Sequence, residues 1–224
     1  MRTTFSLLLV VALSLGVVSA QGEEKKIGFI RLIHALAHGE GKLTLELNGA
    51  DVYPSGYQLG NATGGIGVEA GRCTVVIRRD GVEAGETKVD VKAGETTTVI
   101  PFAEQIPASD DKPAHWQIRI LRLKQTKRQE GRVATFVSVS NQPEIAVEMR
   151  EPEGGWTKQF VKRFGTANLP MNYPEGYVPL RVGEAKLNPI PVMDEGTYVV
   201  VLFDDTEGNV SSISFRDFMH LTAD

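Results

Sequence analysis

Two histidines, separated by three residues, are the first side chains in this chain whose spacing could serve chemistry. Glu40 follows His34 and His38 closely, and imidazole and carboxylate groups are common zinc ligands. The spacing suits a metal only when a helix or a tight turn brings both rings to one side. Here His34 ends an apolar strand-like run, His38 enters a turn, and the sequence offers no second pair of ligands. We therefore expect no metal centre, and a partly buried His34 that hydrogen-bonds a loop backbone.

The segment 56–67 contains five glycines and could be a phosphate-binding loop. It lacks the Gly-Lys-Ser/Thr ending and the following helix that such a loop requires. Glycines that adopt positive φ, or that let strands approach closely, explain the composition better. We therefore predict no cofactor site in this loop, nor elsewhere in the chain.

Catalytic motifs are missing from the sequence. There is no Gly-x-Ser-x-Gly turn and no His-Glu-x-x-His pair, and the single cysteine has no signature neighbour. The acidic pairs Asp110-Asp111 and Asp204-Asp205 fall in a turn-rich segment and at a predicted turn, where no burial would raise a carboxyl pKa. The sequence therefore favours a non-enzymatic protein. A secreted hydrolase or metal enzyme with a site between two domains is the alternative.

A run of basic residues is the first candidate for a binding surface. Clustered cations could hold an anionic polymer or an acidic partner. The alternative is a solvated edge strand and hairpin that charge protects from unwanted pairing, and the pattern favours this alternative. The candidate residues are Arg119, Arg122, Lys124, Lys127, Arg128 and Arg132.

Aromatic residues in the second half of the chain supply the other candidates. Trp156 and Tyr173 stand with Phe160 and Phe164 in one segment. Flat rings could stack on the C–H faces of sugars or could fill a larger core, and core filling is favoured. Trp156 and Tyr173 complete the candidate partner-binding residues. The expected partner is an envelope protein or an acidic polysaccharide.

Short alternating segments predict an all-β fold. Leu43, Leu45 and Leu47 alternate with polar residues and Asn48-Gly49 follows directly, which predicts a type I′ hairpin. About seven short strands at this spacing are typical of an immunoglobulin-like sandwich. We predict a first sandwich over residues 27–106, a linker rich in turn formers over 107–114, and a second sandwich with an insertion over 115–224.

A recurring pentapeptide predicts that the two sandwiches are copies from an internal duplication. Tyr53-Pro54-Ser55-Gly56-Tyr57 returns as Tyr173-Pro174-Glu175-Gly176-Tyr177, and similar apolar strands precede the two copies near Ile30 and Ile118. The spacing in the second copy is longer by about 32 residues, so an insertion is expected there. Tyr57 and Tyr177 should then occupy equivalent places in two superposable sandwiches.

The first twenty residues have the pattern of a secretory signal peptide, with a basic start, an apolar stretch and Val18-Ser19-Ala20 before the expected cleavage point. We expect a mature protein that is periplasmic or extracellular and has no transmembrane segment.

Cys73, the single cysteine, cannot form an intramolecular disulfide and is expected to be a buried, unreactive thiol. The net charge of −4 argues against general nucleic-acid binding.

Three segments of the first half have a family pattern: 30–35, 45–49 and 70–75. They resemble bacterial secreted β-sandwich domains of unknown function, in which an apolar strand ends in Val-His-Ala, a strand closes in Asn-Gly and a glycine begins a Thr-Val strand. The second half departs from this pattern, with Arg122 where His-Ala would begin. Size, export and tandem sandwiches also resemble periplasmic accessory proteins of alginate-type exopolysaccharide O-acetylation. These resemblances imply an exported binding or accessory module at the cell envelope, acting in exopolysaccharide modification or assembly.

Overall fold

The computed structural model describes residues 26–126, 130–217 and 220–223, and within these ranges the chain is all-β. The signal peptide predicted over residues 1–20 lies outside them. Among the described residues, no helix has the length and apolar character to span a membrane. The described chain forms seventeen strands: β1 (Ile27–Leu32), β2 (Glu40–Leu47), β3 (Ala50–Asp51), β4 (Ile66–Glu69), β5 (Gly71–Asp80), β6 (Val82–Val91), β7 (Thr96–Ile106), β8 (His115–Thr126), β9 (Arg132–Ser138), β10 (Glu144–Arg150), β11 (Trp156–Lys162), β12 (Thr166–Pro170), β13 (Gly176–Val182), β14 (Ala185–Val192), β15 (Gly196–Asp204), β16 (Val210–Asp217) and β17 (His220–Ala223).

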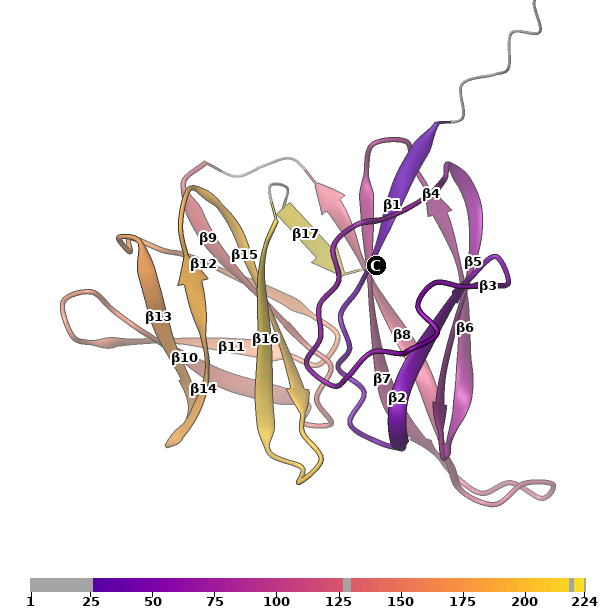
Figure 1. Cartoon of the computed structure of the whole chain (residues 1–224). Coiled ribbons are helices and arrows are strands. Elements are labelled where there is room, and N and C mark those ends of the chain that lie inside the picture. The colour runs from indigo at the N-terminus through magenta and orange to yellow at the C-terminus, as the bar shows by residue number, and fades with distance from the viewer. Residues whose placement is uncertain (1–25, 127–129, 218–219, 224) are drawn as a thin grey trace, which may run out of the picture.

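These strands are arranged in four layers (Figure 1). A nine-stranded sheet has the order β3-β2-β5-β6-β8-β7-β1-β4, and β17 pairs with β8. Because β6 and β8 share only the pair Glu83 and Gln117, this sheet divides into a first outer sheet (β3-β2-β5-β6) and a first inner sheet (β8-β7-β1-β4). The second inner sheet is β12-β9-β15-β16, and the second outer sheet is β11-β10-β13-β14.

An apolar core fills each of the three spaces between the layers. The first core lies between the first outer and first inner sheets and includes Leu45. The middle core joins the two inner sheets and includes Leu123 and Val201. The second core lies between the second inner and second outer sheets and includes Phe136 and Leu180. Because the middle core is shared, the described strands pack as one body rather than as two sandwiches on a linker.

Strand β15 carries the sequence signature of burial on both faces. All its residues from Gly196 to Phe203 are buried, because the second inner sheet has the middle core on one face and the second core on the other. Such a strand needs no polar alternation, which explains the continuous apolar run. In β10, by contrast, buried residues alternate with more exposed ones, because only one face of the second outer sheet meets a core.

The pairing pattern of β1–β8, the first half, recurs in β9–β16, the second half. In each half the first strand pairs parallel with the seventh and antiparallel with the fourth. The second strand pairs with the third and fifth, the fifth with the sixth, and the seventh with the eighth, all antiparallel. Immunoglobulin-like sandwiches consist of two antiparallel sheets. The parallel pairs depart from that arrangement, so immunoglobulin-like connectivity is not confirmed.

The two Tyr-Pro-x-Gly-Tyr segments do not occupy equivalent positions, and this prediction is wrong. The first follows β3, and its Tyr57 forms a bridge with Leu43 of β2. The second leads into β13, and Tyr177 lies within that strand. The shared letters reflect turn chemistry, because Pro and Gly favour chain reversal wherever they occur. The counterpart of β1 is β9 rather than the strand at Ile118, so the expected insertion of about 32 residues is not needed.

The segment 107–114, predicted as a linker, connects the two strands of a hairpin. β7 and β8 pair antiparallel from Thr98 and Leu123 to Ile106 and His115, so both lie in the first inner sheet. Strand β8 therefore pairs with strands of the region 27–106, and the pairing pattern of the second half begins at β9. Turn-forming residues mark a hairpin connection and a linker alike, so composition does not separate the two.

Two local predictions are confirmed. Asn48 and Gly49 have positive φ angles of 51° and 81° between β2 and β3, as a type I′ turn requires. Cys73 is a buried free thiol, and burial raises its pKa. The thiol therefore stays protonated and unreactive at neutral pH.

Candidate functional site

The two histidines proposed as possible ligands serve different contacts. His34 is completely buried, and its Nδ1 accepts a hydrogen bond from the backbone N–H of Leu36 at 3.2 Å, so the predicted loop contact is confirmed. Burial, assisted by the Arg79 guanidinium, lowers the pKa of His34 to about 3. His38 stacks on Trp116, with ring centroids 3.6 Å apart. In the described part of the chain, no three His, Cys, Asp or Glu side chains converge as a metal site would require.

Three members of the predicted basic run lie on β8. Arg119 forms an ion pair with Glu104 across the hairpin at 3.7 Å. The Arg122 guanidinium donates to the carbonyl of Lys88 in β6 at 3.1 Å. Arg122 and Lys124 share one face of the strand, while Arg119 points to the other face, so the three do not form one patch. Lys127 and Arg128 lie outside the described residues.

Arg132, the last member of the run, supports the backbone of the second half. Its guanidinium donates to the carbonyl oxygens of Tyr173 at 2.7 Å and Met193 at 3.0 Å. Tyr173 packs against the second core, in agreement with the core-filling alternative. Neither residue lies in the second outer sheet, which contains Trp156. The structure therefore disperses the predicted binding residues over separate sheets and a loop.

An apolar hollow of about 380 Å³ lies on the exposed face of the second outer sheet. Trp156 comes from β11, Tyr177 and Pro179 from β13, and Pro189 from β14; we call these four residues the platform. On β13 the platform residues alternate with the buried Val178, so they point away from the second core. Tyr177 is 74% exposed, more than any other large apolar side chain that the structure describes. The rest of the lining is Leu180, Arg181, Glu184, Lys186 and Leu187.

The prolines of the platform fit their positions in the sheet. Pro179 lies where the register between β13 and β14 shifts, between Val178 and Leu180. Proline has no N–H to donate to a ladder, so it is tolerated at such irregularities. Pro189 lies on β14, an edge strand, where a donor is also not required. Both positions keep a rigid apolar ring on the exposed face without cost to the pairing.

A network of charged groups holds Trp156 in place. The Arg181 guanidinium lies 4.1 Å from the Trp156 ring centroid, and the Arg150 guanidinium lies 5.4 Å from it. Arg181 is fixed in turn by Glu148, with Nε 2.6 Å from the carboxylate, and Lys158 joins the same carboxylate at 3.2 Å. The hydrogen bond from Arg181, followed by that from Lys158, lowers the pKa of Glu148. The ring is therefore presented in a defined orientation before any ligand binds.

Sequence reasoning found Trp156 but missed Tyr177 and its neighbours. Tyr177 received a structural role because of the recurring pentapeptide, and that assignment hid its position in a strand. The sequence pattern that could have revealed Tyr177 as a surface residue is the alternation from Tyr177 to Val182. In this strand Val178 and Leu180 are buried while Pro179 is exposed. An exposed aromatic and a proline on the same face of a predicted strand indicate a surface that is not simply solvated.

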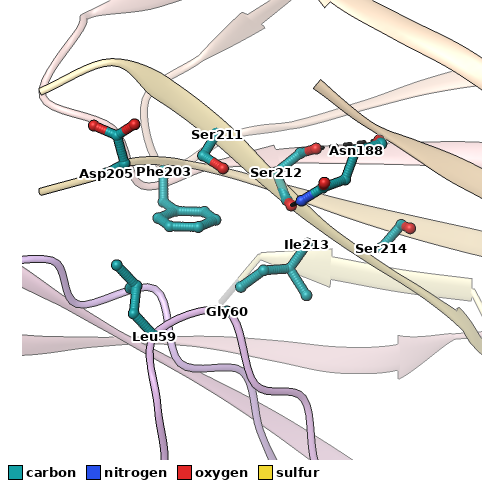
Figure 2. A pocket seen from close by; sticks show the side chains of 9 residues that line it. All are labelled: Leu59, Gly60, Asn188, Phe203, Asp205, Ser211, Ser212, Ile213 and Ser214. Atoms are coloured by element: carbon teal, nitrogen blue, oxygen red, sulfur yellow. Dashed lines mark hydrogen bonds between the residues drawn. The ribbon is translucent and has the colours of Figure 1, made fainter. Parts of the chain in front are cut away.

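A second hollow, of about 430 Å³, lies where the two halves meet (Figure 2). Leu59 and Gly60 of a first-half loop lie opposite Phe203 and Ile213 of the second inner sheet. Two of its polar side chains are engaged: the Ser212 hydroxyl donates to the Asn188 carbonyl at 3.3 Å, and the Asn188 amide donates to the Ser212 carbonyl at 2.7 Å.

Asp205, at the rim of this hollow, has a turn-forming role. One oxygen of its carboxylate accepts the backbone N–H groups of Glu207 and Asn209, each at 2.9 Å. A carboxylate that caps a turn in this way is not paired with a nucleophile. Among the described residues that line the hollow, no hydrogen bond joins a nucleophile to a base, as acyl transfer requires.

No family model matches the chain, and no curated protein matches it. The geometry of the two hollows is therefore the basis for a functional conclusion.

Proposed function

We propose that this protein is an exported, non-enzymatic module that binds polysaccharide at the cell envelope through the platform on its second outer sheet. The observation that carries the proposal is a set of rigid rings gathered on one sheet face, with Trp156 half-buried and Tyr177, Pro179 and Pro189 exposed. Aromatic faces suit the apolar C–H faces of sugar rings, and proline rings extend such a surface without rotamer entropy to lose.

The preorganisation of Trp156 supports this proposal. Ring orientation is fixed by Arg150 and Arg181 in the free protein, so binding loses little side-chain entropy. The resemblance to secreted envelope proteins of exopolysaccharide modification or assembly agrees with a polysaccharide ligand and with export.

An internal duplication is part of the same proposal. The repeated pairing pattern supports descent of β1–β8 and β9–β16 from one eight-stranded ancestor. In this proposal only the second copy acquired the platform. The first copy contributes its inner sheet to the middle core, where it packs against the inner sheet of the second copy.

The experiment is affinity electrophoresis of the full mature chain in gels that contain soluble polysaccharides, with Tyr177→Ala as the test variant. We expect retardation of the wild type and a loss of affinity of about fivefold or more in the variant, because one aromatic contact contributes roughly 1 kcal/mol beyond its buried area. Tyr53→Ala is the matched control, since Tyr53 is an exposed tyrosine, 48% accessible, in the first half.

Two results would contradict the proposal. No retardation by any polysaccharide would remove glycan binding, and equal losses in both variants would remove the platform. Turnover of a glycan or ester by the wild type would instead favour the alternative, a secreted hydrolase with its site in the hollow between the halves.

A further inference from the structure

We propose that the platform selects an anionic polysaccharide, one whose sugar rings carry carboxylate groups. This inference rests on the proposed function and specifies the ligand of that same face. The strands of the second outer sheet carry a net charge of +3 although the whole chain has a net charge of −4, while the turns that join these strands add Glu151, Glu153 and Glu184. Its four strands contain five cationic and two acidic side chains: Arg150, Lys158, Lys162, Arg181, Lys186, Glu144 and Glu148.

Three of these cations, Arg150, Lys162 and Lys186, have no carboxylate partner among the described residues. Glu148 is shared by Arg181 and Lys158 and is therefore fully engaged. Arg150 contacts the Trp156 ring, and Lys186 is exposed with no ion pair. A cation that is held beside an apolar surface and lacks an anion is positioned to receive one from a ligand.

The cations lie within reach of a ring bound on the platform. Lys158, Glu148, Arg181 and Lys186 form one row across the four strands, because each is paired in register with the next. Pro179 lies two residues along β13 from Arg181, a separation of about 7 Å in an extended strand. A sugar ring on the platform would therefore place an acidic substituent near Lys186 or Arg150.

The charge of the first outer sheet supports binding of an anionic polysaccharide on the second outer sheet rather than the first. The strands of the first outer sheet contain five cationic and seven acidic side chains, a net charge of −2. The strands of the second outer sheet therefore favour an anionic polymer more than those of the first. This asymmetry orients the ligand on the second half.

The test compares ligands that share a backbone and differ in charge. Binding of the full mature chain is measured by isothermal titration against polygalacturonate and its methyl ester, and against carboxymethylcellulose and hydroxyethylcellulose. We expect at least tenfold tighter binding to the acidic member of a pair at low salt, with the preference falling as salt screens the charges. Tight binding of neutral members with no preference for acidic ones would overturn the inference and leave the platform intact. Binding to none of the four would count against both the inference and the proposed function.

A pair of charge-removing variants localises the effect. Lys186→Gln should weaken binding of the acidic polymers about threefold to tenfold and leave binding of the neutral ones unchanged. Lys88→Gln removes the same charge from an exposed position of the first outer sheet and should not weaken it. Equal effects of the two substitutions would show that net charge alone, rather than this face, controls binding, and would overturn the inference. Loss of neutral and acidic binding together in Lys186→Gln would also overturn it.

Discussion

The two outer sheets have the same strand order and present different chemistry to solvent. Gly71 begins β5 opposite Val91, and Gly176 begins β13 opposite Val192, so the two strands can be matched residue by residue. Arg72 then corresponds to Tyr177. One step further along the same face, a threonine in β5 corresponds to Pro179 in β13. The buried positions between them are apolar in both halves. The core therefore constrains the inward-facing residues of these strands, whereas the outward-facing residues can differ.

A glutamate–arginine pair occurs in both outer sheets, with equivalent glutamates but with the arginine of the first half two residues further along its strand. Glu46 of β2 pairs with Arg78, and Glu148 of β10 pairs with Arg181. In the first half the arginine is more than half exposed and contacts no aromatic ring in the described residues. In the second half the arginine lies over Trp156. The difference indicates that a surface ion pair, which contributes little to stability on its own, can also hold an aromatic ring in place.

The largest effect we predict tests whether the two halves are one cooperative unit. Phe136, in the second core, corresponds to Ile30 in the first core, and both are completely buried. Truncation of Phe136 to alanine should lower the free energy of unfolding by about 3–5 kcal/mol, and Ile30→Ala by about 2–5 kcal/mol. Because of the middle core, each substitution should shift one single urea transition, followed by circular dichroism and by tryptophan fluorescence. Two separate transitions, with only one displaced in each variant, would show that the halves unfold independently.

A second prediction concerns the second residue after the first strand of each half. His34 follows β1 and Ser140 follows β9, and both are buried. The pKa of His34 is lowered to about 3 in the folded state, so below pH 6.5 the unfolded chain binds a proton that the folded chain does not. Stability is therefore expected to fall with decreasing pH, by about 2 kcal/mol between pH 7 and pH 5. Urea denaturation at the two pH values should show this decrease, and His34→Gln should reduce it by that amount. An unchanged pH dependence in the variant would contradict the assignment.

The smallest predicted effect compares the two glutamates. The pKa of Glu148 is lowered by its hydrogen bonds with Arg181 and Lys158. Its stabilising contribution is present above the unfolded pKa of about 4.3 and is lost as the pH falls through the lower folded value. Fluorescence of Trp156 should therefore change in acid below about pH 4, and Glu148→Gln should produce that change at neutral pH. Glu46→Gln, the matched control, should leave the spectrum unaltered.

The sequence predicts the elements of this fold better than their association. Strand patterns at Leu43 to Leu47 and the Asn48-Gly49 turn are local, because period-2 burial and positive φ depend on neighbouring residues. The grouping of strands depends on contacts that no local pattern encodes. His115 to Thr126 could belong to either half on composition alone, and only pairing with β7 places it in the first inner sheet.

The candidate site was predictable in part for a similar reason. Trp156 is conspicuous as a residue type, whereas Tyr177 and Pro189 become a surface only when β13 and β14 lie side by side. Arg132 illustrates the opposite error. It stands in a basic run in the sequence, but the fold directs its guanidinium to backbone carbonyls.

The central claim is that the second outer sheet, and not its counterpart or the hollow between the halves, is the binding face. The most direct measurement is a nuclear magnetic resonance titration of the full mature chain with short polygalacturonate oligomers, followed through backbone amides and the tryptophan indoles. We predict shifts confined to β10, β11, β13 and β14 and a shift of the Trp156 indole, with the Trp116 indole unmoved. Shifts centred on β2, β5 and β6, or around Ser212 and Leu59, or no shifts at all, would contradict the claim.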